Sequence, residues 1–199
     1  MRIQFVSRLT GAAAATLRPV APILVTAGGA IPVGDGRWQH VVSVSEGDQR
    51  EVVDAGGLRF LTMPFGTNPT ERMHDFEWIL RELEIARTDM VPVVCVSRGT
   101  PGFFLASGTS MEAAVLPHVR ALLREPIRAW IAGETPTAKT VFWRGAEGFT
   151  TTIRGGSNPF GAAGFCSEIF MDVSTDAVRE IPLLRQLTSG QNYGMYRLK

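Results

Sequence analysis

The chain has 199 residues, of which 45% are hydrophobic and 20% are charged, and its formal net charge is +1. This length fits one domain with a sizeable core. The near-neutral charge, with basic residues spread along the chain, excludes the basic stripe that is typical of nucleic-acid-binding proteins. The mean hydropathy of +0.08 is on the apolar side for a soluble protein, so we expect part of the surface to be covered by other subunits.

The first third of the chain predicts a strand over residues 2–7, followed by a passage over residues 9–37 that is rich in glycine and proline. We expect this passage to be extended and loop-like, because Pro19, Pro22 and the pair Gly28-Gly29 disfavour regular structure. It is too short and too often interrupted to span a membrane. A continuous apolar signal-peptide region is also missing, so the sequence predicts a cytoplasmic or particle-bound protein.

Two further strands are predicted over residues 38–44 and 58–63. Between them, residues 46–49 form either a turn or the start of a short helix that ends at Gly56-Gly57. The sequence leaves both alternatives open.

The clearest predicted element is an amphipathic helix over residues 68–87. Asn68 is placed as the N-cap, Pro69 as the first helical residue, and Glu71 closes a capping box. An apolar face at helical spacing follows, formed by Met73, Phe76, Leu80 and Leu83. His74 falls beside this face, and we expect it to be solvated.

Residues 91–96 predict an internal strand, and a second amphipathic helix follows it. Thr109 and Glu112 have the spacing of a capping box, and Val115, Val119 and Leu122 continue at helical spacing. Beyond residue 126, strands over 127–131, 140–143 and 149–153 are separated by glycine-containing turns, which favours antiparallel hairpins.

These elements predict an α+β fold, with a mixed N-terminal part that contains two amphipathic helices and a β-rich C-terminal part with mostly antiparallel strands. Residues 1–189 form a single domain in this prediction, and residues 190–199 form a C-terminal interaction tail. The tail carries Tyr193, Met195 and Tyr196, residue types that are enriched at interfaces, so we expect these three to contact other subunits.

One segment resembles a catalytic motif. Gly108-Thr109-Ser110-Met111 resembles the serine motif of subtilisin-like proteases, and the resemblance implies that Ser110 is a nucleophile. A serine needs a neighbouring histidine as base. The upstream candidates are His40 and His74, because His118 lies more than two helical turns beyond Ser110. The His-Gly-Thr and Asp-Thr/Ser-Gly segments of that family are missing upstream, and the capping box explains the same residues structurally.

Cofactor and metal sites are not expected. Cys95 and Cys166 lack a spaced cysteine or histidine partner, so we expect free thiols rather than a zinc site. The glycine-rich span over residues 155–164 lacks the lysine of a phosphate-binding loop.

Two functional hypotheses follow. The first is a structural or assembly subunit of a larger particle, for example a phage head, tail or baseplate component, that contacts copies of itself and other subunits and is not an enzyme. The alternative is a serine hydrolase or acyl-transfer enzyme with Ser110 as nucleophile and His74 or His40 as base.

Overall fold

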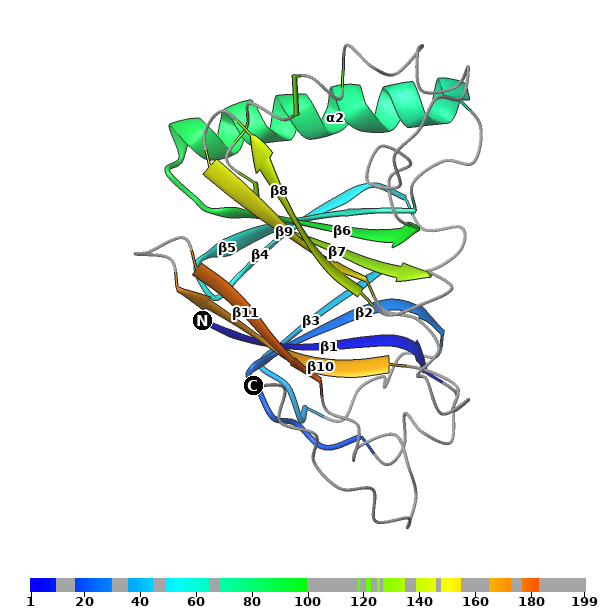
Figure 1. Ribbon diagram of the computed structural model, residues 1–199, viewed down its shortest axis with the longest axis vertical. Helices are drawn as coiled ribbons and strands as arrows, with labels where there is room; N and C mark the ends of the chain where they lie inside the picture. The colour runs from blue at the N-terminus through cyan, green and yellow to red at the C-terminus, as the bar shows by residue number, and fades with distance from the viewer. Residues whose placement is uncertain are drawn as a thin grey trace.

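Strands dominate the described part of the chain. The computed structural model describes residues 1–9, 17–29, 36–44, 49–64, 69–99, 118, 121–122, 125, 127–134, 139–145, 148–154, 165–172 and 177–182. These residues form two sheets that pack face to face, and one long helix covers the outer face of one of them (Figure 1). The layers therefore follow the order helix, sheet, sheet.

The first sheet has the strand order β11-β10-β1-β2-β3. Its strands are β1 (Arg2–Leu9), β2 (Ile23–Gly29), β3 (His40–Val44), β10 (Phe165–Asp172) and β11 (Ala177–Pro182). Strands β1, β2 and β3 are parallel to one another, whereas β10 runs antiparallel to both β1 and β11. We call it the five-stranded sheet.

The second sheet has the strand order β4-β5-β6-β7-β9-β8 and is called the six-stranded sheet. Its strands are β4 (Glu51–Ala55), β5 (Leu58–Met63), β6 (Val93–Gly99), β7 (Ile127–Glu134), β8 (Lys139–Gly145) and β9 (Gly148–Arg154). Strands β5, β6, β7 and β9 are parallel, and β4 and β8 are antiparallel edges.

The β4–β5 hairpin depends on two glycines. Ala55 pairs with Leu58, so the loop consists of Gly56 and Gly57 alone, and their φ angles are 59° and 78°. A two-residue turn of this kind needs a positive φ at both positions, which glycine adopts without steric cost. The alternative of a short helix that ends at Gly56-Gly57 is therefore wrong, because residues 51–55 form β4; of the expected turn over residues 46–49, residues 46–48 lie outside the described ones.

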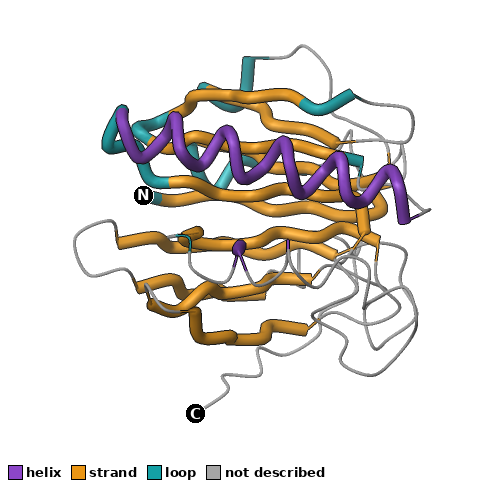
Figure 2. The backbone as a smooth tube through the Cα atoms, turned by 90° about the horizontal axis from the view of Figure 1, so that it is seen from above, coloured by secondary structure: helices purple, strands orange, loops and turns teal. Residues whose placement is uncertain are grey.

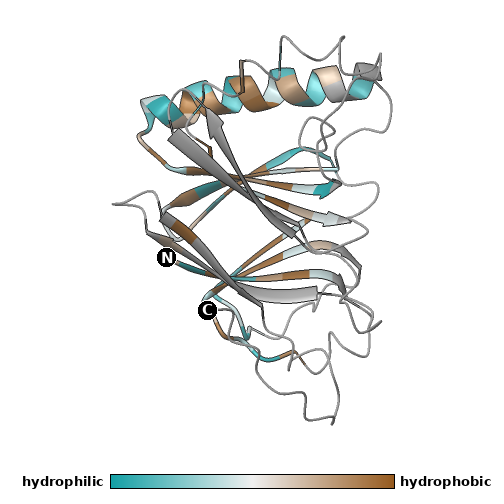
Figure 3. Cartoon of the chain, in the orientation of Figure 1, coloured by the Kyte–Doolittle hydropathy of each residue, from teal (hydrophilic) through white to brown (hydrophobic). Residues whose placement is uncertain are grey.

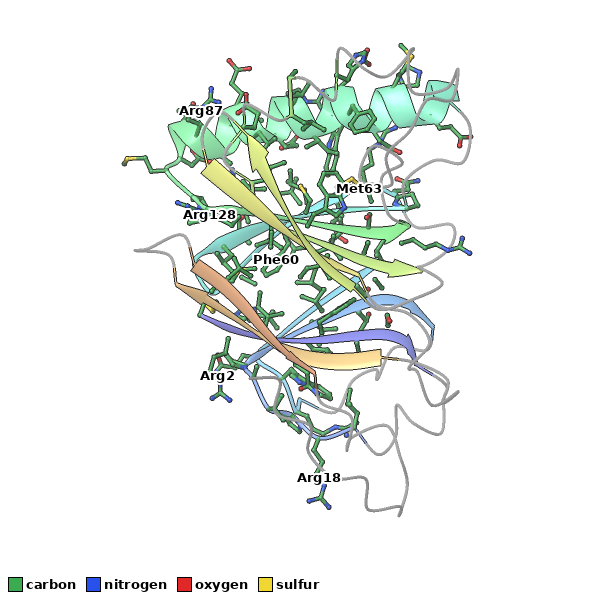
Figure 4. The ribbon with its side chains drawn as sticks, viewed as in Figure 1. Arg2, Arg18, Phe60, Met63, Arg87 and Arg128 are labelled. Carbon is green, nitrogen blue, oxygen red and sulfur yellow. The ribbon has the colours of Figure 1, made fainter. Side chains whose placement is uncertain are left out.

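Two apolar cores use opposite faces of the six-stranded sheet. Phe60, Val94 and Ile131 point toward the five-stranded sheet, whereas Leu61, Cys95 and Trp130 point toward the helix. This alternation is what a strand buried on both faces requires. Figure 4 shows Phe60 between the two sheets and Met63 on the helix side, and Figure 3 shows apolar residues in the middles of the described strands and polar and apolar residues alternating along the helix.

The helix is α2 (Pro69–Thr88), and it runs across the outer face of the six-stranded sheet (Figure 2). Its apolar face buries Phe76, Ile79, Leu83 and Ala86 in the core against that sheet. The predicted helix over residues 68–87 is confirmed from Pro69 onward. The residues expected in the second helix lie mostly outside the described ones, but His118, Ala121 and Leu122 are helical and Leu122 is buried in the same core.

The predicted fold class is wrong. The described residues hold one long helix and two sheets that mix parallel and antiparallel strands, instead of two amphipathic helices with a mostly antiparallel C-terminal part. The hairpin β8–β9 is antiparallel as expected, but β7 is parallel to both of its neighbours. Turn residues specify a local hairpin, whereas the partner of β7 is chosen by burial on both faces of the sheet.

The passage over residues 9–37 also differs from the expected loop. It contains β2, which lies between β1 and β3 and buries Ile23, Leu24 and Val25. Pro19 and Pro22 precede this strand, so neither removes a ladder hydrogen bond from it. The prolines therefore mark its beginning.

Candidate functional site

The carboxyl ends of the parallel strands are the first place to look for chemistry. Strands β5, β6, β7 and β9 run in the same direction, so their carboxyl ends meet at one edge of the six-stranded sheet. In open sheets of this kind, ligands bind outside that edge. Helix α2 begins shortly after β5, and the segment that contains Ser110 follows β6.

Near the end of β6, a buried serine is committed to a structural role. The indole Nε1 of Trp130 donates a hydrogen bond to Ser97 Oγ at 2.8 Å, and both side chains are fully buried. A buried indole N–H needs such an acceptor. Ser97 therefore satisfies the tryptophan and is closed to solvent.

A partly buried ion pair joins the N-terminal half of α2 to the residue before β4. Arg50 Nε lies 2.6 Å from Asp75 Oδ1, and Asp75 is 3% exposed. The arginine stands immediately before β4, so the pair connects the second turn of the helix with the edge of the sheet. A buried carboxylate without this partner would be costly, which makes the pair a fixed point of the structure.

Glu77 lies between two histidines. Its Oε2 is 3.5 Å from His74 Nδ1 and its Oε1 is 3.8 Å from His118 Nε2, while the ring of His118 stacks on Phe76. Both distances exceed those of a well-formed hydrogen bond, so Glu77 does not orient either imidazole as a base. His118 Nδ1 is buried and has no hydrogen-bond partner among the residues that the structure describes.

The structure does not bring the predicted catalytic histidines together. His74 is exposed on α2, as expected, whereas His40 is the exposed first residue of β3. The helix and the five-stranded sheet cover opposite faces of the six-stranded sheet, so the two histidines lie in different layers. Ser110 lies outside the described residues, and the serine-hydrolase hypothesis stays a prediction.

His118 is the histidine whose contacts the sequence did not predict. Its helical distance from Ser110 disfavours it as the base for that serine, yet it lies beside Phe76 and Glu77 of α2. The packing of two helices decides this contact, and a single sequence carries no spacing signal for it.

The edges of the two sheets form a second candidate site, one for protein contacts. Among the described strands, β3 and β11 are the edges of the five-stranded sheet, and β4 and β8 are the edges of the six-stranded sheet. Strands β8 and β11 both contain charged residues. Strand β3 reads His-Val-Val-Ser-Val and contains no acidic residue, lysine or arginine, and Val41 is 44% exposed. An uncharged edge strand offers its main-chain groups to another strand.

Strand β4 differs from β3 in its charges. It carries Glu51 and Asp54, and Arg59 of β5 binds Asp54 in a two-pronged contact with both N···O distances at 2.9 Å. Hydrogen bonds from Arg59 hold the pKa of the Asp54 carboxyl below its ordinary value. Charges on an edge strand oppose pairing with another chain, so β4 is protected where β3 is not.

The other expected sites can be placed only in part. The predicted interface residues Tyr193, Met195 and Tyr196 lie outside the described residues. In the described part of the chain, no group of three or more histidine, cysteine or acidic side chains could hold a metal ion. The one described helix of sufficient length is too polar to cross a bilayer.

Comparisons with known proteins add no assignment to this geometry. No protein-family model matches the chain, and a search of curated proteins finds no similar sequence.

Proposed function

We propose that this protein is a subunit of a protein assembly and that it makes contacts through β3, which is an edge strand of the five-stranded sheet in the described part of the chain. The observation that carries the proposal is the composition of β3, an edge strand without a formal charge. The apolar composition of the whole chain supports the same function, since surplus apolar surface is usually covered by another subunit.

The physical argument concerns unsatisfied main-chain groups. An edge strand presents a row of N–H and C=O groups, and proteins that stay monomeric protect such edges with charges, proline or bulges. Within the described residues β4 has charges, whereas β3 has none of these features and a smooth register with β2. Addition of a strand from another chain would satisfy the main chain of β3.

Exposed side chains at the edge support the proposal further. Val41 is 44% exposed and points to the outer side of the five-stranded sheet, because Val42 and Val44 point into the core between the sheets. A strand laid against β3 would cover part of this valine. The contact would therefore combine main-chain hydrogen bonds with apolar burial.

To test the proposal, the tagged chain is isolated from its source, and the mass of the complexes that contain it is measured. We expect complexes larger than the 21.6 kDa of one chain. Ser43→Pro removes an edge N–H and should abolish these complexes, whereas Val52→Lys on the protected edge β4 should leave them intact. A chain recovered only at 21.6 kDa would contradict the proposal.

A further inference from the structure

We infer that β3 binds a single extended segment of a partner protein, which places an apolar side chain over Val53 of β4 and a lysine or arginine over Glu51. This inference rests on the proposed function and names the chemistry of the partner. It depends on the position of β4 in the second layer and on the side chains of its inner face.

Strand β4 lies beyond the edge of β3 in the opposite sheet. Strand β3 contacts β5 and β6 across the two layers, and β4 pairs with β5 on the side away from β6. A strand added to β3 would therefore lie over the inner face of β4, as one layer of a sandwich lies over the other. A second sheet does not fit beside β3, because its own partner layer would occupy the space of β4.

The inner face of β4 offers one apolar and one acidic side chain. Ala55 is buried in the core between the sheets, and Val53 packs partly against the same core. Side chains alternate along a strand, so Glu51 points to this face as well, whereas Val52 and Asp54 point to the helix side. Val53 is half-buried and Glu51 is exposed, so both can gain contacts from an added strand.

The carboxylate of Glu51 is available to a cation. The two neighbouring acidic residues are already paired, Asp54 with Arg59 and Asp75 with Arg50. Glu51 forms no ion pair with any residue that the structure describes. Lysine and arginine have long stems that can reach it from the facing layer, and opposite charges across an interface favour one partner over others.

The alternation of a strand sets the spacing of the partner's side chains. Residues i and i+2 share one face, and Glu51 and Val53 are themselves two residues apart. A segment with an apolar residue over Val53 therefore carries its cation two residues away. The side chains between them lie on the outer side of the five-stranded sheet, beside the exposed Val41.

The main chain of β3 provides the hydrogen bonds. His40 N–H donates to the carbonyl of Pro22 at 3.3 Å, and His40 pairs with Ile23 in the parallel ladder. Main-chain groups alternate along a strand, so the N–H and C=O groups of Val41 and Ser43 point to the edge. These groups can pair with the main chain of any extended segment, so the specificity comes from β4.

The inference is tested with the synthetic peptide Thr-Arg-Thr-Val-Thr-Arg-Thr, which has an arginine two residues from its valine in either strand direction. Its binding to the purified full chain is measured by NMR. We expect a dissociation constant of roughly 0.1–1 mM, because a seven-residue segment buries little surface. The shifts should centre on the amides of Val41 and Ser43. Thr-Glu-Thr-Val-Thr-Glu-Thr should bind about tenfold more weakly, since it places carboxylates near Glu51.

Charge reversal separates this contact from non-specific attraction. In Glu51→Arg the preference should invert, so that the arginine peptide binds about tenfold more weakly than to the wild type and the glutamate peptide binds more tightly. Glu84→Arg is the matched control, because Glu84 is exposed on α2 and the change in charge is the same. Its affinities for both peptides should equal those of the wild type.

Two results would overturn the inference. One is a wild-type chain that does not bind the arginine peptide at about 5 mM, well above the expected dissociation constant. The other is an equal loss of binding in Glu51→Arg and Glu84→Arg. The complexes isolated from the source distinguish the two proposals: if Ser43→Pro abolishes them and Glu51→Arg leaves them intact, the proposed function stands and this partner chemistry is wrong. Peptide binding as expected by a chain that forms no complexes would contradict the proposed function alone.

Discussion

Gly133 of β7 lies directly against Ala27 of β2, so that the two sheets touch there through their backbones. A Cβ added to Gly133 would lie 2.1 Å from the carbonyl oxygen of Ala27 and 2.4 Å from its Cβ. Real Cβ atoms do not approach other atoms so closely. Both of these atoms belong to Ala27, which is buried in β2 and cannot easily move away. The short distance between the two sheets at this point is therefore possible only because residue 133 is a glycine.

Gly133→Ala should destabilise the fold by about 2–4 kcal/mol, because the sheets must separate to make room for one methyl group. In an ordinary strand the same change would be neutral or stabilising, since alanine loses less backbone entropy on folding. Urea unfolding of both chains measures the difference. Gly36→Ala is the control: Gly36 also lacks a side chain but has open space around it, so only its positive φ opposes the substitution. Equal stabilities of Gly133→Ala and wild type would show that the sheets are not in contact there.

At Met90, in contrast, a substitution should increase the stability of the fold. It follows α2 with a φ of 55°, and the bonds Met90 N–H to Arg87 C=O and Val91 N–H to Ala86 C=O close the helix end. This position favours glycine, and the methionine side chain is 89% exposed. Met90→Gly should therefore stabilise the isolated chain by about 0.5–1 kcal/mol in thermal unfolding.

Met90→Ala separates the two causes. Alanine removes the side chain but keeps the strained backbone, so its stability should match that of the wild type. A loss of stability in both variants would mean that the methionine packs against its own domain.

The thiol of Cys95 should be unreactive in the folded protein. Its thiol is a buried free thiol, and burial raises its pKa well above the ordinary value. Because the thiolate is the reactive form, Cys95 should not react with a thiol reagent at pH 7 to 9 until the chain unfolds. The measurement compares labelling of Cys95, identified by mass spectrometry, with and without denaturant. Rapid labelling of Cys95 under native conditions would contradict the packing of β6 between two cores.

Local patterns predicted several elements well. The helix over 68–87 and the strands over 58–63 and 91–96 are confirmed, because each has an apolar period that matches one kind of backbone. Strand β2 was missed because the prolines and glycines that flank it gave the stronger local signal. Its central position depends on pairing with β1 and β3, which no local pattern reveals.

The pairing of strands that are distant in the sequence could not be predicted for the same reason. Strand β1 pairs with β10, so that Ile3 lies beside Ile169. Contacts between residues so far apart are chosen by the burial of whole faces and not by neighbouring residues. The candidate sites share this property: Glu77 meets His118 across two elements, and the free edge of β3 exists only because no other described strand was placed beside it.

The outer face of the five-stranded sheet gives the last prediction. Gln4 of β1 is fully buried there and forms a hub between two segments: its Oε1 accepts hydrogen bonds from Trp38 Nε1 at 2.9 Å and from Val20 N–H at 3.1 Å, and its Nε2 donates to the carbonyl of Arg18 at 3.0 Å. Gln4→Leu keeps most of the volume but leaves these groups without their partner, so it should cost about 2–4 kcal/mol of unfolding free energy. Trp38→Phe removes one donor and should cost less. Since both changes break the same bond, urea unfolding of the double variant should show a coupling of about 1–2 kcal/mol. Additive costs would mean that the tryptophan is held by its packing alone and that Gln4 does not fix the segments on either side of β2.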